Sequence, residues 1–303
     1  MESAPGVLAL PAVGQRLERH DHNRRSPSWL AEVWDAAETR VLRLDAGRAP
    51  MLEGPRLDFS APQGALPEGA VYLGAHTGRH VVAVPTPGAA QSGWADLRTL
   101  GAQLDPLEAG VLTQATAVLN WHADSAFCPR CGARTEVRSS GWMRHCPACG
   151  AEHFPRTDPA IIAAVVDDQD RLLLGSAHRW EASRYSTFAG FIESGESVEE
   201  TVVREIAEEA GVRVTRVEFL GSQAWPFPRS LMLGCLAHIA DPSTARADEE
   251  EIRDVRWFTR EQLHAEVADA VIGIPPRSSI SRALIEHWYG DTLPDLDTWT
   301  RGA

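Results

Sequence analysis

Seven glutamates, one arginine and no lysine fall within the 23 residues from Gly190 to Val212, which read GFIESGESVEETVVREIAEEAGV. Ser197 and Glu200 have the spacing of a capping box, and Gly211 suits the left-handed position that ends a helix. These signals predict a helix over residues 198–210. Its apolar side chains recur at helical spacing, and we expect one buried stripe formed by Val198, Val202, Val203, Ile206 and Ala210.

The glutamates of this helix repel one another, because like charges three or four residues apart are neighbours on a helix surface. At about 100° per residue, Glu205, Glu208 and Glu209 share one face, and Arg204 lies four residues before Glu208 and can pair with it. A solvated acidic face is the usual interpretation of such a helix. A divalent cation such as Mg²⁺ or Mn²⁺ would instead reverse the repulsion, because hard cations take oxygen ligands.

The stretch also has a fixed pattern: Gly190, five residues, Glu196, seven residues, and then REIAEEAGV at residues 204–212. This pattern resembles the Nudix box at every fixed position. The resemblance implies an α/β fold, an α/β/α sandwich with a mixed sheet. It also implies a hydrolase that cleaves a nucleoside diphosphate linked to another group, with divalent metal held by glutamates of the box helix.

The resemblance assigns roles to individual side chains. The residues it implies for catalysis are Glu196, Arg204, Glu205, Glu208 and Glu209. Glu205 and Glu209 are implied as the principal ligands of Mg²⁺ or Mn²⁺, and Glu208 as a further ligand or the base. Glu251 is implied as the ligand from outside the helix, although three consecutive glutamates leave Glu250 as the alternative. Glu196 and Arg204 are expected to hold the loop before the helix and to orient the metal ligands.

Four cysteines form two pairs, CPRCG at residues 128–132 and CPACG at residues 146–150, with fourteen residues between the pairs. In a reducing compartment this spacing is typical of a zinc ribbon, and a glycine after each pair allows a tight turn. The predicted ligands of Zn²⁺ are Cys128, Cys131, Cys146 and Cys149. Four ligands leave no open position, so we expect a structural zinc.

The ribbon segment has five arginines and two glutamates between residues 128 and 156. Zinc with four thiolates reduces the resulting local charge to about +1, so the ribbon is a weak candidate for binding nucleic acid. A small domain stapled by metal is the favoured interpretation, and a nucleic-acid reader is the alternative. We expect His145 and His153 to be spare surface residues and Cys235 to be a buried small side chain.

A second motif, SQAWPFPRS at residues 222–230, resembles the SQPWPFPxS signature of the NADH pyrophosphatase subfamily, with Ala224 in place of the first proline. The likeness extends to the ribbon, to FPR at 154–156, to EIRDVRWF at 251–258 and to IPPRSSISRALI at 274–285, and more loosely to DLRTL at 96–100. The substrate-binding residues that it implies are Arg98, Phe154, Phe191, Gln223, Trp225, Pro226, Phe227, Ser230 and Ser281.

Composition and chain length set the remaining expectations. With 303 residues we expect several domains: a supporting α+β domain at 1–125, the ribbon at 126–156, the Nudix domain at 157–290 and a tail at 291–303. A strand is expected over 79–86 and a helix around 107–121. The net charge of −13 disfavours bulk binding of nucleic acid, and no apolar run is long enough to cross a membrane. We expect a cytoplasmic protein, and the resemblance implies a homodimer.

These features favour an enzyme that hydrolyses NAD(H) to AMP and nicotinamide mononucleotide and that also removes the NAD cap from RNA. One alternative is a Nudix hydrolase of ADP-ribose or another nucleoside diphosphate derivative. A further alternative is a nucleotide-sensing regulator whose ribbon binds nucleic acid.

Overall fold

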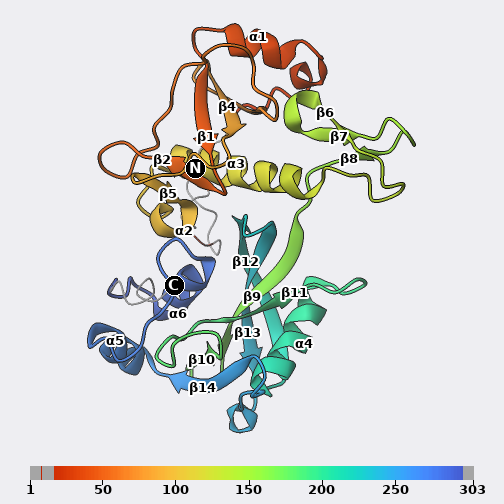
Figure 1. Ribbon diagram of the computed structural model, residues 1–303. Helices are drawn as coiled ribbons and strands as arrows, with labels where there is room; N and C mark the ends of the chain where they lie inside the picture. The colour runs from red at the N-terminus through yellow and green to blue at the C-terminus, as the bar shows by residue number, and fades with distance from the viewer. Residues whose placement is uncertain (1–7, 9–16, 296–303) are drawn as a thin grey trace. The chain divides into compact units, whose positions relative to one another are not determined.

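The computed structural model describes residue 8 and residues 17–295, which divide into two compact units (Figure 1). The first unit contains residues 158–224 and 230–295, together with residue 8, and the second contains residues 17–157 and 225–229. The short segment 225–229 comes from the middle of the first unit's sequence but packs within the second.

The first unit is built on a mixed sheet of six strands. Its strands are β9 (Asp158–Val166), β10 (Leu172–Ala177), β11 (Phe188–Phe191), β12 (Val214–Trp225), β13 (Ser230–Ile239) and β14 (Ile252–Phe258). The order is β12-β13-β9-β10-β14, with β11 also paired to β9. β13 runs parallel to β9, whereas β10 and β11 run antiparallel to it, so the expected mixed sheet is confirmed.

Helices cover both faces of this sheet. Because side chains alternate along a strand, neighbouring residues of β9 point to opposite faces. Ile162 and Ala164 of β9 face a core that includes residues of α5 (Arg260–Ala268) and α6 (Ile280–Tyr289). Ile161 and Ala163 face the opposite core, which includes residues of α4 (Val198–Ala210). A short 3-10 helix, η3, spans Pro242–Thr244. The expected α/β/α sandwich is therefore confirmed, and Cys235 is fully buried in it as predicted.

Helix α4 begins and ends where the sequence predicts. Ser197 accepts a hydrogen bond from the backbone of Glu200, whose side chain returns the bond, and Gly211 ends the helix at φ 66°. The predicted apolar stripe is wrong at one position. Val203 is 42% exposed, whereas Glu209 is 6% exposed. Compared with the predicted orientation, α4 is turned about its own axis so that Glu209, and not Val203, faces the interior.

The second unit contains a three-stranded sheet between two helices. Its elements before the ribbon are η1 (Asn23–Arg25), α1 (Trp29–Asp35), β1 (Arg40–Leu44), β2 (Arg48–Pro50), β3 (Val71–His76), β4 (Arg79–Pro85), β5 (Trp94–Asp96), α2 (Leu97–Leu100) and α3 (Pro106–Asp124). β4 lies between β1, which is parallel to it, and β3, which is antiparallel. Leu73 and Ala83 pack with α3, while Tyr72 and Val82 pack with α1. The expected strand and helix correspond to β4 and α3.

The ribbon follows α3 and is held by short strands. They are β6 (Glu136–Arg138), β7 (Met143–His145) and β8 (Glu152–His153), with the 3-10 turn η2 (Ser139–Gly141) between β6 and β7. The three strands pair antiparallel in the order β6-β7-β8.

The described part of the expected tail is packed. Leu293 is buried, and its carbonyl oxygen accepts a hydrogen bond of 2.7 Å from Arg282 Nη2. Residues 296–303 of the tail, and residues 1–7 and 9–16 of the expected N-terminal domain, lie outside the described residues. Among the helices that the structure describes, none has the length and apolar character needed to cross a bilayer.

Candidate functional site

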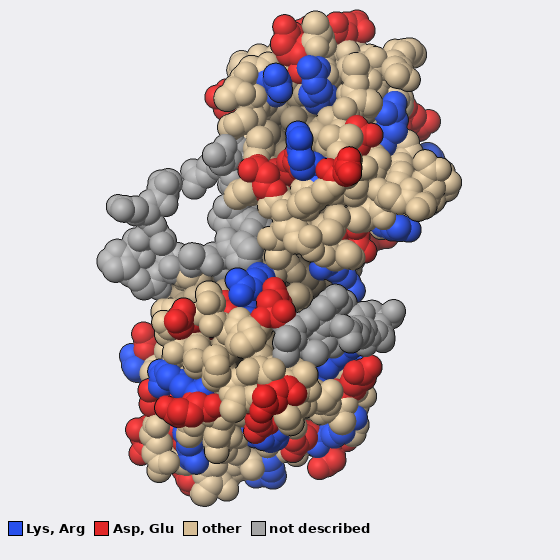
Figure 2. All heavy atoms as spheres, turned by 90° about the vertical axis from the view of Figure 1, so that its left-hand side faces the viewer, with Lys and Arg blue, Asp and Glu red and all other residues tan. Residues whose placement is uncertain are grey.

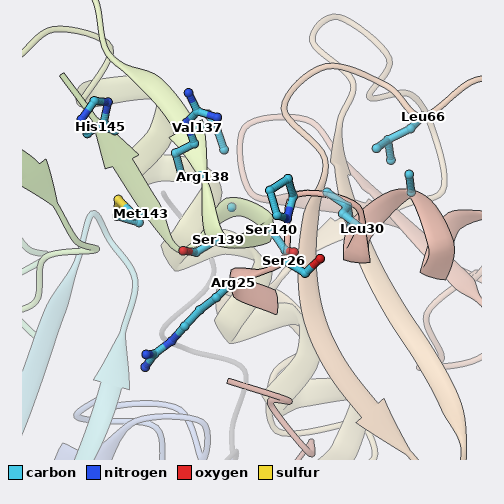
Figure 3. Close-up of a pocket in the computed structure, with 13 residues that line it drawn as sticks. Arg25, Ser26, Leu30, Leu66, Val137, Arg138, Ser139, Ser140, Met143 and His145 are labelled. Carbon is cyan, nitrogen blue, oxygen red and sulfur yellow. The ribbon is translucent and has the colours of Figure 1, made fainter. Parts of the chain in front are cut away.

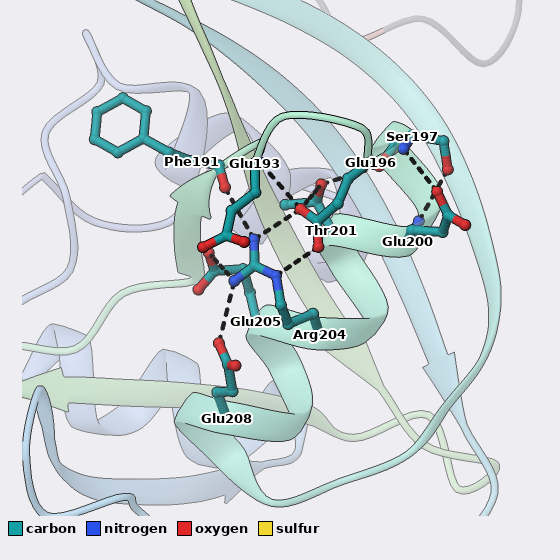
Figure 4. Close-up of polar contacts among 9 residues, drawn as sticks. All are labelled: Phe191, Glu193, Glu196, Ser197, Glu200, Thr201, Arg204, Glu205 and Glu208. Atoms are coloured by element: carbon teal, nitrogen blue, oxygen red, sulfur yellow. Dashed lines mark hydrogen bonds and ion pairs between the residues drawn. The ribbon is translucent and has the colours of Figure 1, made fainter.

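Arg204 is the centre of the carboxylate cluster on α4 (Figure 4). Its Nε and Nη2 donate to the two carboxylate oxygens of Glu196 at 2.6 and 2.9 Å. Its Nη1 donates to Glu205 at 2.8 Å and to Glu208 at 3.1 Å, which confirms the predicted pairing across one helical turn. Nη2 also donates to the carbonyl oxygen of Phe191 at 3.0 Å. One guanidinium thus ties the loop before α4 to the helix.

The charges of this network perturb one another. Hydrogen bonds from Arg204 lower the pKa of Glu196 to about 2, and the carboxylates raise the pKa of Arg204. Glu196 also accepts from the Thr201 hydroxyl and from the backbone of Glu193. The Glu196–Arg204 pair therefore stays charged and positions the loop.

Glu205 lies against the backbone of β11. A Cβ atom built on Gly190 would be 1.9 Å from the Glu205 carboxylate, so only glycine leaves room for that side chain in this position. Burial raises the pKa of Glu205, while the Arg204 charge opposes that shift. Gly190, the first glycine of the motif, is thus required because the carboxylate of Glu205, fifteen residues later, occupies the space that a side chain would take.

Glu209 is a carboxylate buried without a full set of partners. Its Oε2 has no hydrogen-bond partner among the described residues. Burial, followed by the charges of Glu205, Glu251 and Asp248, raises the pKa of Glu209 to about 8. An isolated buried carboxylate is costly, and a bound cation removes that cost. The unpartnered oxygen and the neighbouring carboxylates therefore fit a divalent metal.

Glu251 approaches the cluster from the loop before β14. Asp248 fixes this loop by accepting hydrogen bonds from the backbone N–H groups of Glu251, at 3.1 Å, and Ile252, at 2.8 Å. Both Glu251 and Asp248 act electrostatically on Glu209. Asp248 was not predicted from the sequence, although it directly precedes Glu249 and its side chain accepts a hydrogen bond from the backbone of Glu250, two residues on, as in a common aspartate turn.

Glu208 differs from the other two helix carboxylates. Its side chain is 60% exposed, whereas that of Glu205 is 13% exposed. Glu205, Glu209 and Glu251 thus lie within electrostatic reach of one another, whereas Glu208 lies on the solvent side, held by Arg204.

A cavity of about 330 Å³ opens beside Glu209 and Glu251. Glu209, Glu250 and Glu251 line one part of it, so both residues left open by the sequence face this space. The rest is lined by residues of β10 and the turn after it, by the start of β11 with the residue before it, and by the first residue of β14, namely Gly175, Ala177, His178, Arg179, Trp180, Thr187, Phe188, Ala189 and Ile252.

Four predicted substrate residues belong to the first unit. Phe191 is 58% exposed at the start of the box loop. Gln223 is buried, donating to the Ser278 carbonyl and accepting from the Ile280 N–H, both at 2.8 Å. Ser230 is buried, and the hydroxyl of Ser281 bonds to those of two residues just before β11. Gln223 and Ser281 thus hold the start of α6 in place.

The other five belong to the second unit. Trp225 and Phe227 meet edge to face, with ring centroids 5.1 Å apart, and the Arg98 guanidinium lies 4.2 Å from the Phe227 ring centroid. The carbonyl oxygen of Pro226 accepts from Asn120 at 3.1 Å. Phe154 is 57% exposed. Arg98 and the signature aromatics are thus brought together, although they are far apart in sequence.

The four predicted zinc ligands converge. Their sulfur atoms lie within 4.8 Å of one another, close to the roughly 3.8 Å expected when four sulfurs surround a tetrahedral zinc. Gly132 and Gly150 take left-handed conformations, and their N–H groups donate to the carbonyls of Cys128 and Cys146. The cluster fits structural zinc. His153 is not a spare residue as expected, because its Nε2 lies 3.3 Å from Cys128 Sγ.

A larger cavity of about 500 Å³ lies in the second unit, beside α1 and the ribbon (Figure 3). Its lining includes Arg25, Leu30, Arg138 and His145 but none of the predicted site residues. On the face drawn in Figure 2, acidic and basic side chains are interspersed on both units, without a continuous basic stripe. Neither feature favours the alternative of a nucleic-acid-binding ribbon.

Three family models match consecutive parts of the chain. The NUDIX domain matches residues 156–274, the NADH pyrophosphatase zinc ribbon domain matches 123–154, and the NADH pyrophosphatase-like rudimentary NUDIX domain matches 38–121. The last match contains DLRTL at 96–100, to which the likeness had been extended loosely, but a second Nudix-like domain in this region was not predicted from the sequence.

Relatives of known name cover much of the chain. The NAD-capped RNA hydrolase NudC of Mycobacterium tuberculosis is 37% identical over 294 residues, covering 89% of this chain and 92% of its own length. The NAD-capped RNA hydrolase NUDT12 of Homo sapiens is 41% identical over 198 residues, covering 61% of this chain and 43% of its own length. Among solved structures, a NUDIX hydrolase from Nitrosomonas europaea is 21% identical with a TM-score of 0.38, covering 55% of this chain and 94% of its own.

Proposed function

This chain belongs to the NADH pyrophosphatase family of Nudix hydrolases, and we propose that it hydrolyses the diphosphate bond of NAD(H) and of NAD caps on RNA. The products are AMP and nicotinamide mononucleotide from NAD(H), and RNA with a 5′ phosphate together with nicotinamide mononucleotide from capped RNA. The observation that carries the proposal is the buried, incompletely partnered carboxylate of Glu209 beside Glu205 and Glu251. The names of the relatives supply the substrate class.

We assign the catalytic divalent cation to Glu205, Glu209 and Glu251, and we propose Mg²⁺ or Mn²⁺ because all three offer oxygen ligands. When bound, the cation neutralises the diphosphate and polarises it toward attack by water. Glu208 is exposed and held by one hydrogen bond, so its other oxygen remains available to accept a proton from the attacking water. Arg204 and Glu196 hold this arrangement in place.

The substrate rings require flat apolar faces. We propose Phe191 as a stacking residue of the first unit, because its side chain is exposed. In the second unit we propose Phe154, which is exposed, and Trp225, which packs edge to face on Phe227. Arg98, Pro226 and Phe227 support the signature loop, while Gln223, Ser230 and Ser281 shape the site from buried positions.

Three further properties are proposed with the function. The zinc is structural and occupies the ribbon, the protein is cytoplasmic, where thiolates remain reduced, and it forms a homodimer. Light scattering on a size-exclusion column tests the dimer directly.

The function is tested by incubating the protein with Mg²⁺ or Mn²⁺ and NADH, NAD⁺, ADP-ribose or NAD-capped RNA, and resolving the products. We expect AMP from NADH, and removal of the cap from RNA. Glu209→Gln should lower turnover by at least about 10³-fold, because it removes a metal ligand. Glu199→Gln is the matched control, since Glu199 is an exposed glutamate of the same helix. Release of AMP from ADP-ribose alone would contradict the assigned substrate.

A further inference from the structure

The carboxylate cavity includes one turn that the assigned chemistry does not use. His178, Arg179 and Trp180 follow β10 and line the same 330 Å³ space as Glu209 and Glu251. No motif of the sequence marks this turn. Its position beside the carboxylates therefore needs a physical explanation.

The turn is fixed to the loop that bears Glu251. The backbone N–H of His178 donates to the Glu251 carbonyl at 2.9 Å, and Trp180 N–H closes the turn on Ala177 O at 3.0 Å. From β14, Nη2 of Arg253 donates to the carbonyls of Ala177, at 2.8 Å, and Trp180, at 2.6 Å. Four hydrogen bonds thus hold the turn in a defined position beside the ligand loop.

Arg179 stands at the tip of this turn with its charge available. Its side chain is exposed, its guanidinium carbon lies 5.5 Å from the Trp180 ring centroid, and no ion pair joins it to a described acidic residue. Glu181, two residues later, approaches Arg184 at 3.9 Å. Among the described residues that line the cavity, Arg179 is the one arginine, and Glu209, Glu250 and Glu251 also face this space.

A diphosphate that enters this cavity meets three carboxylates. The cation offsets part of this negative charge, but oxygens of the diphosphate that are not bound to the cation still require donors. A planar guanidinium supplies paired N–H donors that match phosphate oxygens, and stacking on an indole ring limits the positions it can take.

We propose that Arg179 is a substrate-binding residue that holds the diphosphate of the dinucleotide from the turn after β10. The proposal rests on the proposed function and adds the residue that recognises the phosphate at that site. Trp180 stacks beneath the guanidinium, and Arg253 positions the turn.

The test compares Arg179→Gln with Arg213→Gln, which removes the same charge from an exposed arginine of the same unit outside the cavity. Steady-state rates with NADH are measured together with calorimetric binding of inorganic pyrophosphate in the presence of Mn²⁺. Arg179→Gln should raise KM for NADH and Kd for pyrophosphate by about tenfold or more, with kcat changed less than about threefold, because one charge-assisted pair of hydrogen bonds is lost. Arg179→Lys should restore part of the affinity, since it keeps the charge and loses the fork.

The Mn²⁺ affinity without pyrophosphate separates binding of substrate from support of the metal. We expect it to be unchanged or tighter in Arg179→Gln, because a nearby positive charge is removed. Wild-type values of KM and of the pyrophosphate Kd in Arg179→Gln would overturn the proposal even if the enzyme hydrolyses NADH. Conversely, a wild-type protein that hydrolyses no dinucleotide but binds pyrophosphate through Arg179 would contradict only the proposed function.

Discussion

Replacing Gly190 by alanine tests how closely the backbone of β11 sets the position of Glu205. The added Cβ would lie 1.9 Å from the carboxylate carbon and from one of its oxygens, whereas ordinary contact begins at 3.4 Å. The carboxylate must therefore retreat by about 1.5 Å, losing its place beside Arg204 Nη1. Because φ at this glycine is not in the left-handed region, alanine fits the backbone, and the fold should be retained.

A displacement of about 1 Å in a catalytic group can cost about 10²-fold in rate. We expect Gly190→Ala to lower kcat/KM for NADH by about that factor and to weaken Mn²⁺ binding, measured by electron paramagnetic resonance. Thermal unfolding should be close to that of the wild type. Adding Glu205→Asp, which shortens the side chain by one methylene, should cost much less in Gly190→Ala than in the wild type, because the two changes act on one contact. Wild-type kcat/KM in Gly190→Ala would refute the steric argument.

Two further predictions concern stability. In metal-free protein the folded pKa of Glu209, about 8, lies above its ordinary value of 4.5, so stability should fall as pH rises from about 4.5 to 8, by on the order of 5 kcal/mol. Urea unfolding should show this loss, and Glu209→Gln or saturating Mn²⁺ should remove it; a flat profile in the metal-free wild type would contradict the burial argument. For the ribbon, Cys146→Ser should lose zinc and lower the Tm by roughly 10 °C, while Cys235→Ala, in the other unit, should retain full zinc content by elemental analysis. Equal zinc in both variants would contradict the assigned ligands.

Local signals in the sequence predicted the elements that local interactions decide. The capping box at Ser197 and the left-handed Gly211 predicted both ends of α4, and the cysteine spacing predicted the two tight turns of the zinc ribbon. These features depend on backbone hydrogen bonds within a few residues.

The rotation of α4 was not predictable in the same way. Residue type placed Val203 in the stripe and put three glutamates on one face, but packing against the sheet buries Glu209 and exposes both Val203 and Glu208. The roles of Asp248 and Arg179 were not predicted for a related reason, because each lies near Glu209, which is distant from both in sequence.

The ion pair between Arg204 and Glu196 also limits how the active site of this enzyme can change with pH. A guanidinium with a raised pKa facing a carboxylate whose pKa is about 2 remains ionised at pH values well above 2. Acid or alkali within the physiological range therefore cannot loosen the frame around the reacting groups. Any bell-shaped profile of rate against pH must therefore originate in groups other than Arg204 and Glu196. The loop that this pair holds keeps its position across that pH range.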